Sequence, residues 1–114
     1  MGLLLILEVK IRFMHIVATK LAEAVAEGSY DRGILICGTG IGVCLAASKV
    51  KGAYPALLTD IYSAKRARLS NNANIACFGA FTIGNKLREE LLDAFLNKRI
   101  CARLLFPALK LMRS

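Results

Sequence analysis

A cysteine directly before a glycine-rich turn is the feature of this chain with the clearest chemical potential. The apolar run Ile34-Leu35-Ile36 leads into Cys37, and the next five residues are Gly38-Thr39-Gly40-Ile41-Gly42. Several backbone N–H groups of such a turn can point at one spot, and the N-terminus of a following helix adds positive potential there. The pattern therefore predicts a thiol that acts as a base beside an anion-binding site.

The spacing of these glycines excludes two common phosphate-binding motifs. Val43 stands where the dinucleotide-binding fingerprint needs its third glycine, and no Gly-Lys-Ser/Thr follows the turn. A purely structural turn, with Cys37 as filler of a buried strand, is the simpler alternative.

A second polar segment precedes an apolar run further along the chain. Its sequence is Ser70-Asn71-Asn72-Ala73-Asn74. Asparagine amides can hydrogen-bond a polyol, although asparagine is also common where a helix stops. We expect a surface or capping role for the single histidine, His15. Arg66 and Arg68 are expected to be solvated, unless one of them meets a phosphate.

Composition limits the size of the protein and its partners. The chain has 114 residues, of which 56% are hydrophobic, so we expect one domain with a sizeable core. We also expect such an apolar chain to bury part of its surface against another copy. Of the net charge of +8, most lies after residue 64, in 65–68 and in the tail from 98 to 113. Such a basic region fits a phosphorylated small molecule or nucleic acid. Trp is absent and aromatic residues are few near these charges, which argues against nucleic acid.

The four cysteines predict reduced thiols rather than a metal site. None form a Cys-x-x-Cys pair, so we expect no zinc. The run from Gly2 to Leu7 is too short to span a membrane and lacks a basic leader. We expect a cytoplasmic protein without membrane contact.

Alternating strand and helix patterns predict an α/β fold. We expect strands over 3–11, 33–37, 54–59 and 74–78, and helices over 14–27, 42–48, 61–69 and 85–96. This order predicts a three-layer sandwich around a mainly parallel, Rossmann-like sheet. Ligands of such sheets bind beyond the carboxyl ends of the strands. The Cys37 turn follows a strand, whereas Asn71 precedes one and must reach the site from a helix end.

The motifs together resemble the ribose-5-phosphate isomerase B family, which also holds the galactose-6-phosphate isomerase subunits. The resemblance runs over about residues 18–96, and the segment 62–73 resembles the branch that acts on tetrose phosphates such as erythrulose 4-phosphate. The matching segments are Tyr30 to Gly42, Lys49-Val50-Lys51-Gly52, Thr59-Asp60-x-Tyr62-Ser63-Ala64, Asn71-x-Ala73-Asn74-Ile75 and the turn from Gly79 to Gly84.

The resemblance implies aldose–ketose isomerisation through an enediolate, without metal or cofactor. Cys37 would move the proton between adjacent carbons, Thr39 would assist ring opening, and Asn71 would hold a substrate hydroxyl. The amides of Gly38, Gly40, Ile41 and Gly42 would stabilise the oxyanion. The implied substrate is ribose 5-phosphate, ribulose 5-phosphate or a tetrose 4-phosphate, and the implied assembly is a homodimer or higher homo-oligomer.

The chain departs from that family at both ends. Relatives begin with a strand leading into a Ser-Asp-His-Ala-Gly type motif, whereas residues 1–13 hold one short apolar segment, so the fold is expected to be truncated there relative to the family. A Gly-Arg-His…Arg segment of relatives is replaced by residues 98–103. Within the match, a proton-donating histidine falls at Ser70 and a phosphate-contacting arginine at Phe81. Two alternatives stay open: a degenerate, non-catalytic member or partner subunit, and a basic module that binds another anion or nucleic acid.

Overall fold

The sheet of this protein is four-stranded and parallel throughout. The computed structural model describes residues 4–8 and 14–97, with the backbone alone for 4–8. The strands lie in the order β1-β2-β4-β3. The elements in chain order are β1 (Leu4–Glu8), α1 (Met14–Ala26), β2 (Arg32–Cys37), α2 (Ile41–Ser48), β3 (Pro55–Leu57), α3 (Ile61–Leu69), β4 (Ile75–Gly79) and α4 (Asn85–Asn97).

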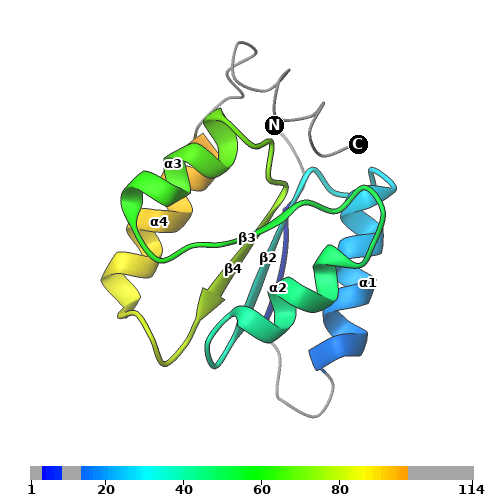
Figure 1. Cartoon of the computed structure of the whole chain (residues 1–114), viewed down its shortest axis with the longest axis horizontal. Helices are drawn as coiled ribbons and strands as arrows, with labels where there is room; N and C mark the ends of the chain where they lie inside the picture. Colours follow the sequence, from blue (N-terminus) through cyan, green and yellow to red (C-terminus); the bar gives the residue numbers. More distant parts are fainter. Residues whose placement is uncertain (1–3, 9–13, 98–114) are drawn as a thin grey trace.

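Two pairs of helices cover the two faces of the sheet. Helices α1 and α2 pack together on one face, and α3 and α4 pack together on the other (Figure 1). The predicted three-layer α/β sandwich with a parallel Rossmann-like sheet is confirmed, and every predicted element of the described region is present. The part of the first predicted strand beyond Glu8 and the segment 98–103 lie outside the described residues.

The central strands alternate their side chains between two cores. Leu35 and Cys77 are level with one another on β2 and β4 and lie in the core under α1 and α2. Ile34 and Ala76, the next pair in the register, lie in the core under α3 and α4. Both faces of these strands are covered, which explains why their sequences read as continuous apolar runs.

Strand β3 forms one edge of the sheet. It pairs with β4 alone and begins at Pro55. Proline has no N–H to donate, so an edge position or a strand start is where a sheet tolerates it.

The helix ends follow their local sequence. Asp60 caps α3 by accepting a hydrogen bond from the backbone N–H of Ser63 at 2.7 Å. On α1, Leu21 and Val25 are buried, whereas Ile16 is 57% exposed. Among the described helices, none combines the length and the hydropathy needed to cross a bilayer.

Candidate functional site

Cys37 is the last residue of β2 and lies at the carboxyl end of the sheet. It is level with Gly79, the last residue of β4, and it is 7% exposed, so little of it reaches the surface. The backbone N–H of Gly40 donates a hydrogen bond to the Cys37 sulfur at 3.2 Å. A negative charge that developed on this sulfur would therefore have a donor already in place.

Gly40 makes the turn possible because it meets two demands at once. Its φ of 80° lies in the left-handed region, where it forms the N-cap of α2. A Cβ atom built on Gly40 would lie 2.6 Å from Leu57 Cδ1 and 2.8 Å from the carbonyl carbon of Phe78. The turn thus packs against β3 and β4 at a distance that only glycine permits.

The other two glycines of the turn lie against side chains. A Cβ on Gly38 would lie 3.2 Å from the ring of Phe81, and a Cβ on Gly42 would lie 2.5 Å from Met14 Cε. Gly42 therefore lets α2 pack against α1, a structural role beside its predicted role as a donor.

Thr39 is exposed at the tip of the turn. Its hydroxyl oxygen accepts a hydrogen bond from the backbone N–H of Ile41 at 3.3 Å. The amides of Gly40 and Ile41 thus already have acceptors within the turn, on Cys37 and Thr39 respectively.

Backbone hydrogen bonds join the turn to the loop after β4. The N–H of Ala80 donates to the Cys37 carbonyl at 2.7 Å, and the N–H of Phe81 donates to the Gly38 carbonyl at 3.0 Å. Phe81 itself is 89% exposed, and Ile41 and Leu45, the first and fifth residues of α2, are 51% and 61% exposed. Apolar side chains therefore surround the rim of the turn.

The structure does not bring Asn71 to Cys37 within one chain. Asn71 precedes Ile75 by four residues, and Ile75 begins β4 at the end of the sheet opposite Gly79 and Cys37 (Figure 1). At about 3.3 Å per residue, these ends lie about 13 Å apart. The expectation that Asn71 reaches Cys37 from a helix end is therefore not met by a single copy.

Most amides of the predicted polyol-binding segment hold the backbone instead. Asn74 accepts from the N–H of Tyr54 at 2.8 Å and donates to the carbonyl of Gly52 at 3.1 Å. Asn72 has a φ of 51° and accepts from Arg68. Asn71 donates to the carbonyl of Arg66 at 3.1 Å but is exposed, so it is the asparagine of the segment best placed to meet a ligand.

Arg68 is buried, and its expected solvation was wrong. It is 4% exposed and donates to the carbonyl of Ala73 at 2.5 Å and to Asn72 Oδ1 at 3.3 Å. Burial, and then repulsion by Arg32, lower the pKa of Arg68 to about 10. Through these hydrogen bonds, Arg68 holds in place the segment that contains Asn71. Arg66 is half-buried and donates to the hydroxyl of Ser70.

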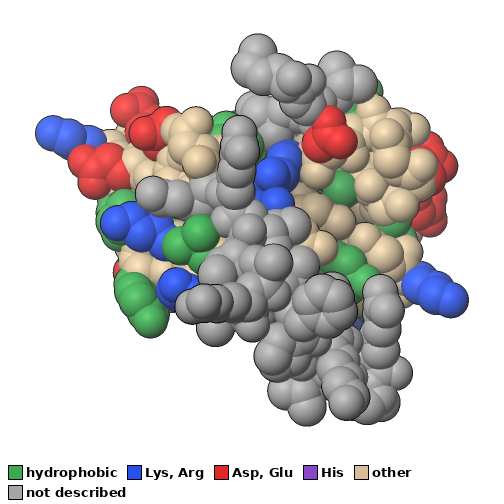
Figure 2. Space-filling view, turned by 90° about the horizontal axis from the view of Figure 1, so that it is seen from above, with side chains coloured by type: hydrophobic (Ala, Val, Ile, Leu, Met, Phe, Trp, Pro, Cys, Tyr) green, Lys and Arg blue, Asp and Glu red, His purple; other side chains and the backbone are tan. Residues whose placement is uncertain are grey.

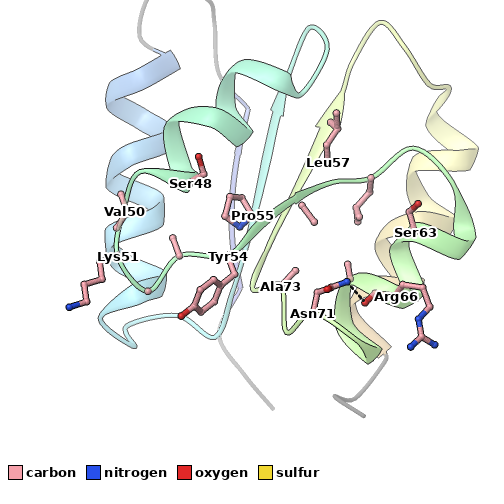
Figure 3. Close-up of a pocket in the computed structure, with 15 residues that line it drawn as sticks. Ser48, Val50, Lys51, Tyr54, Pro55, Leu57, Ser63, Arg66, Asn71 and Ala73 are labelled. Carbon is pink, nitrogen blue, oxygen red and sulfur yellow. Dashed lines mark hydrogen bonds between the residues drawn. The ribbon is translucent and has the colours of Figure 1, made fainter. Parts of the chain in front are cut away.

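A cleft of about 1090 Å³ runs along the outer side of β3, between α2 and α3 (Figure 3). Lys51 and Tyr54 come from the segment before the strand, and Arg66 and Asn71 come from α3 and the segment after it. Sequence reasoning missed Lys51 and Tyr54, although their place just before an edge-strand proline was a signal. Cys37 does not line this cleft, so the predicted site residues fall into two groups.

The face drawn in Figure 2 carries charges of both signs, and basic and acidic side chains are interspersed on it. His15 is exposed near the start of α1, as expected for a surface or capping residue. Within 4–8 and 14–97, no three His, Cys, Asp or Glu residues gather as metal ligands would.

Comparison with known proteins places this architecture in context. The family model described as Ribose/Galactose Isomerase matches residues 10–103. The chain is 51% identical over 81 residues to a D-erythrulose-4-phosphate isomerase of Pectobacterium atrosepticum, covering 71% of this chain and 53% of that protein. It is also 51% identical over 81 residues to a ribose-5-P isomerase B of Listeria innocua, covering 71% of this chain and 55% of that protein.

A solved structure shows the same fold. The chain superposes on ribose-5-phosphate isomerase B of Mycoplasma genitalium, determined with bound ribulose-5-phosphate, with a TM-score of 0.81 and 36% identity, covering 88% of this chain and 67% of that one. The chain spans about half the length of the curated relatives it matches. The resemblance predicted from the motifs is confirmed.

Proposed function

We propose that this chain, which belongs to the ribose/galactose isomerase family, is a sugar-phosphate isomerase that interconverts an aldose phosphate and its ketose through an enediolate. One observation carries the proposal. The Cys37 thiol lies where β2 ends, a glycine turn follows it, and the N–H of Gly40 points at its sulfur at 3.2 Å. Enolisation needs a base near a carbon acid and donors near the growing charge, and this turn supplies both.

The proposed chemistry moves protons only. In the open-chain aldose phosphate, the Cys37 thiolate removes the proton from C2, and the electrons of that C–H bond form the enediolate with the C1 carbonyl. The C2 hydroxyl gives its proton to the oxygen on C1, so that C2 becomes the carbonyl carbon while the same thiol returns the first proton to C1, which yields the ketose. Thr39, exposed at the tip of the turn, assists ring opening. The amides of Gly38, Gly40, Ile41 and Gly42 donate to the enediolate oxygen, and those of Gly40 and Ile41 exchange their present acceptors for it.

The proposed substrates are sugars with four or five carbons and a terminal phosphate. Two relatives of equal identity are named for erythrulose 4-phosphate and ribose 5-phosphate, so both pairs of isomers are candidates. The three described cysteines are free thiols, which supports a reducing, cytoplasmic location.

The proposed site is completed by a second copy of the chain. Cys37 and Asn71 lie at opposite ends of the sheet, so a site that uses both needs Asn71 of one copy beside the turn of another. The exposed apolar side chains of Ile41, Leu45 and Phe81 around the turn support a contact at that place. We therefore infer a homodimer with sites shared between protomers.

The activity is tested with purified protein and each of ribose 5-phosphate, ribulose 5-phosphate and erythrulose 4-phosphate. Isomerisation of one pair is expected, and Cys37→Ala should lower kcat/KM by about 10²–10⁴-fold because the base is lost. Cys44→Ala, on the same side of the sheet, serves as the matched control and should retain activity. Absence of turnover with all three sugars contradicts the proposal.

The shared site is tested by mixing two inactive variants. Cys37→Ala and Asn71→Ala each inactivate their own homodimer, but a mixed dimer contains one site with both residues intact. Equal mixing after subunit exchange should restore about a quarter of wild-type activity. No recovery in a mixture shown to contain mixed dimers contradicts the sharing, even where the isomerase activity itself is established.

A second candidate function is sugar-phosphate binding without turnover. The observation that favours it is the separation of the two groups of residues, since Lys51, Arg66 and Asn71 line a cleft that Cys37 does not line. Calorimetric binding of ribose 5-phosphate in the absence of any isomerisation would select this candidate over the first.

A further inference from the structure

We propose that Cys44 and Cys77 form a redox-active dithiol, a site that a hydroperoxide oxidises to an intramolecular disulfide between α2 and β4. The site is distinct from the proton transfer proposed for Cys37. It rests on three features of the structure: the adjacency of two sulfurs, their unequal exposure, and the position of the third thiol.

The two cysteines meet across the interface between α2 and the sheet. Cys44 is the fourth residue of α2 and is half-buried, whereas Cys77 is in the middle of β4 and is 0% exposed. Gly40, one helical turn before Cys44, lies against the backbone of Phe78 and Gly79. Cys44 therefore lies over the part of β4 that holds Cys77, and the two thiols interact. Both pack in the same apolar core, so no polar group needs to be displaced for the sulfurs to approach one another.

A hydrogen bond between the two thiols gives them different acidities. It lowers the pKa of Cys44 to about 7, against the opposing effect of burial. The pKa of Cys77 is raised, first because its proton is held in that bond and then because the residue is buried. The partly exposed sulfur is therefore the one that carries negative charge, as attack on a peroxide requires.

The chemistry balances with a hydroperoxide as the only co-reactant. The Cys44 thiolate attacks one peroxide oxygen, an S–O bond forms, the O–O bond breaks, and the leaving oxygen takes up a proton as water or an alcohol. The Cys77 sulfur then attacks the sulfenic acid at Cys44. An S–S bond forms, the S–O bond breaks, and the departing hydroxide takes the Cys77 proton. Two thiols lose two electrons in total, and the peroxide gains them.

Cys37 is less favourably placed than Cys44 or Cys77 to take part in a disulfide. It lies on the same face as Cys77 but is level with Gly79, two residues further along β4, or about 7 Å away along the strand. Its sulfur already accepts the N–H of Gly40. The Cys37 thiol is therefore expected to stay reduced when the disulfide forms.

The test follows the thiols directly and needs no isomerase assay. A Cys101→Ser background removes the cysteine that lies outside the described residues and leaves three thiols. After treatment with hydrogen peroxide, the intact mass should fall by two hydrogen atoms and peptide mapping should find residues 44 and 77 joined. Dithiothreitol should reverse both changes. The oxidation rate should rise as the pH rises through about 7.

Matched variants assign the roles of the two sulfurs. In Cys77→Ala, dimedone should trap a sulfenic acid at Cys44 because no thiol resolves it. In Cys44→Ser, Cys77 should stay reduced because it has no exposure to peroxide. A disulfide that contains Cys37, or the addition of oxygen atoms to Cys44 while Cys77 stays a thiol in the unmutated pair, overturns the proposal. Peptide mapping of the protein that retains both Cys44 and Cys77 tests the proposal even if a variant fails to fold.

Discussion

Two phenylalanines three residues apart have opposite roles. Phe78 is 0% exposed in the core under α3 and α4, whereas Phe81 is 89% exposed over Gly38. Phe78→Ala should lower the free energy of unfolding by about 3–5 kcal/mol because it leaves a cavity. Phe81→Ala should change it by less than about 0.5 kcal/mol. Denaturant unfolding of both variants checks this, and equal losses would contradict the assigned burial.

Gly79 packs closely against the glycine turn. A Cβ on Gly79 would collide with the Thr82 hydroxyl and lie 2.8 Å from the carbonyl oxygen of Thr39. Gly79→Ala should therefore cost about 1–3 kcal/mol of stability and displace Thr39. A Cβ on Gly84 would meet nothing within 4 Å, so Gly84→Ala is the control. Thermal unfolding and kcat together test this, and an unchanged Gly79→Ala protein would refute the close packing.

The sequence predicted individual site residues unevenly, and the reasons are physical. A continuous apolar run identified the strand that ends at Cys37, because only a strand covered on both faces has such a sequence. Burial of Arg68 was missed because a charged side chain predicts solvent. Its signal was the spacing, since Arg68 follows the buried Ala64 by four residues and therefore shares its helix face.

At the scale of the element, the stability of α3 depends on its N-cap residue, Asp60. Hydrogen bonds from the backbone N–H and then the hydroxyl of Ser63 lower the pKa of Asp60, which is fully exposed. A lowered carboxyl pKa means that its stabilisation is present at neutral pH and is lost as the pH falls through the folded-state pKa. Asp60→Ala should lower Tm at neutral pH, and its difference from wild type should shrink below about pH 4.

The control for this prediction is Glu90→Ala, an exposed acidic residue in the middle of α4. It should leave Tm nearly unchanged at every pH. If the difference in Tm between Asp60→Ala and wild type stayed constant down to acid pH, the cap would not act through its charge.

The helices and strands were easier to predict than the contacts between them. The sequence pattern predicted a helix over 61–69, the bounds that the structure shows for α3. The same reasoning placed Asn71 before a strand and Cys37 after one, which already implied opposite ends of the sheet. Whether such ends meet depends on contacts between copies, and no periodicity within one chain encodes those contacts.

At the scale of the whole molecule, the account requires two copies. Leu45→Glu places a charge among the apolar side chains around the glycine turn and should shift the protein toward monomer. Tyr62→Glu introduces the same charge at another exposed apolar residue, on α3 across the sheet, and should leave the assembly intact. Sedimentation velocity compares the two. An unchanged Leu45→Glu dimer would place the contact elsewhere on the surface.

The most direct measurement of the central claim is proton exchange at the sugar carbons in deuterium oxide. NMR spectroscopy should show wild-type protein interconverting its substrate while deuterium enters the carbon next to the carbonyl, and Cys37→Ala should abolish both signals while keeping its folded spectrum. If Cys37→Ala incorporates deuterium and isomerises the sugar as fast as wild type, the thiol at the end of β2 is not the base.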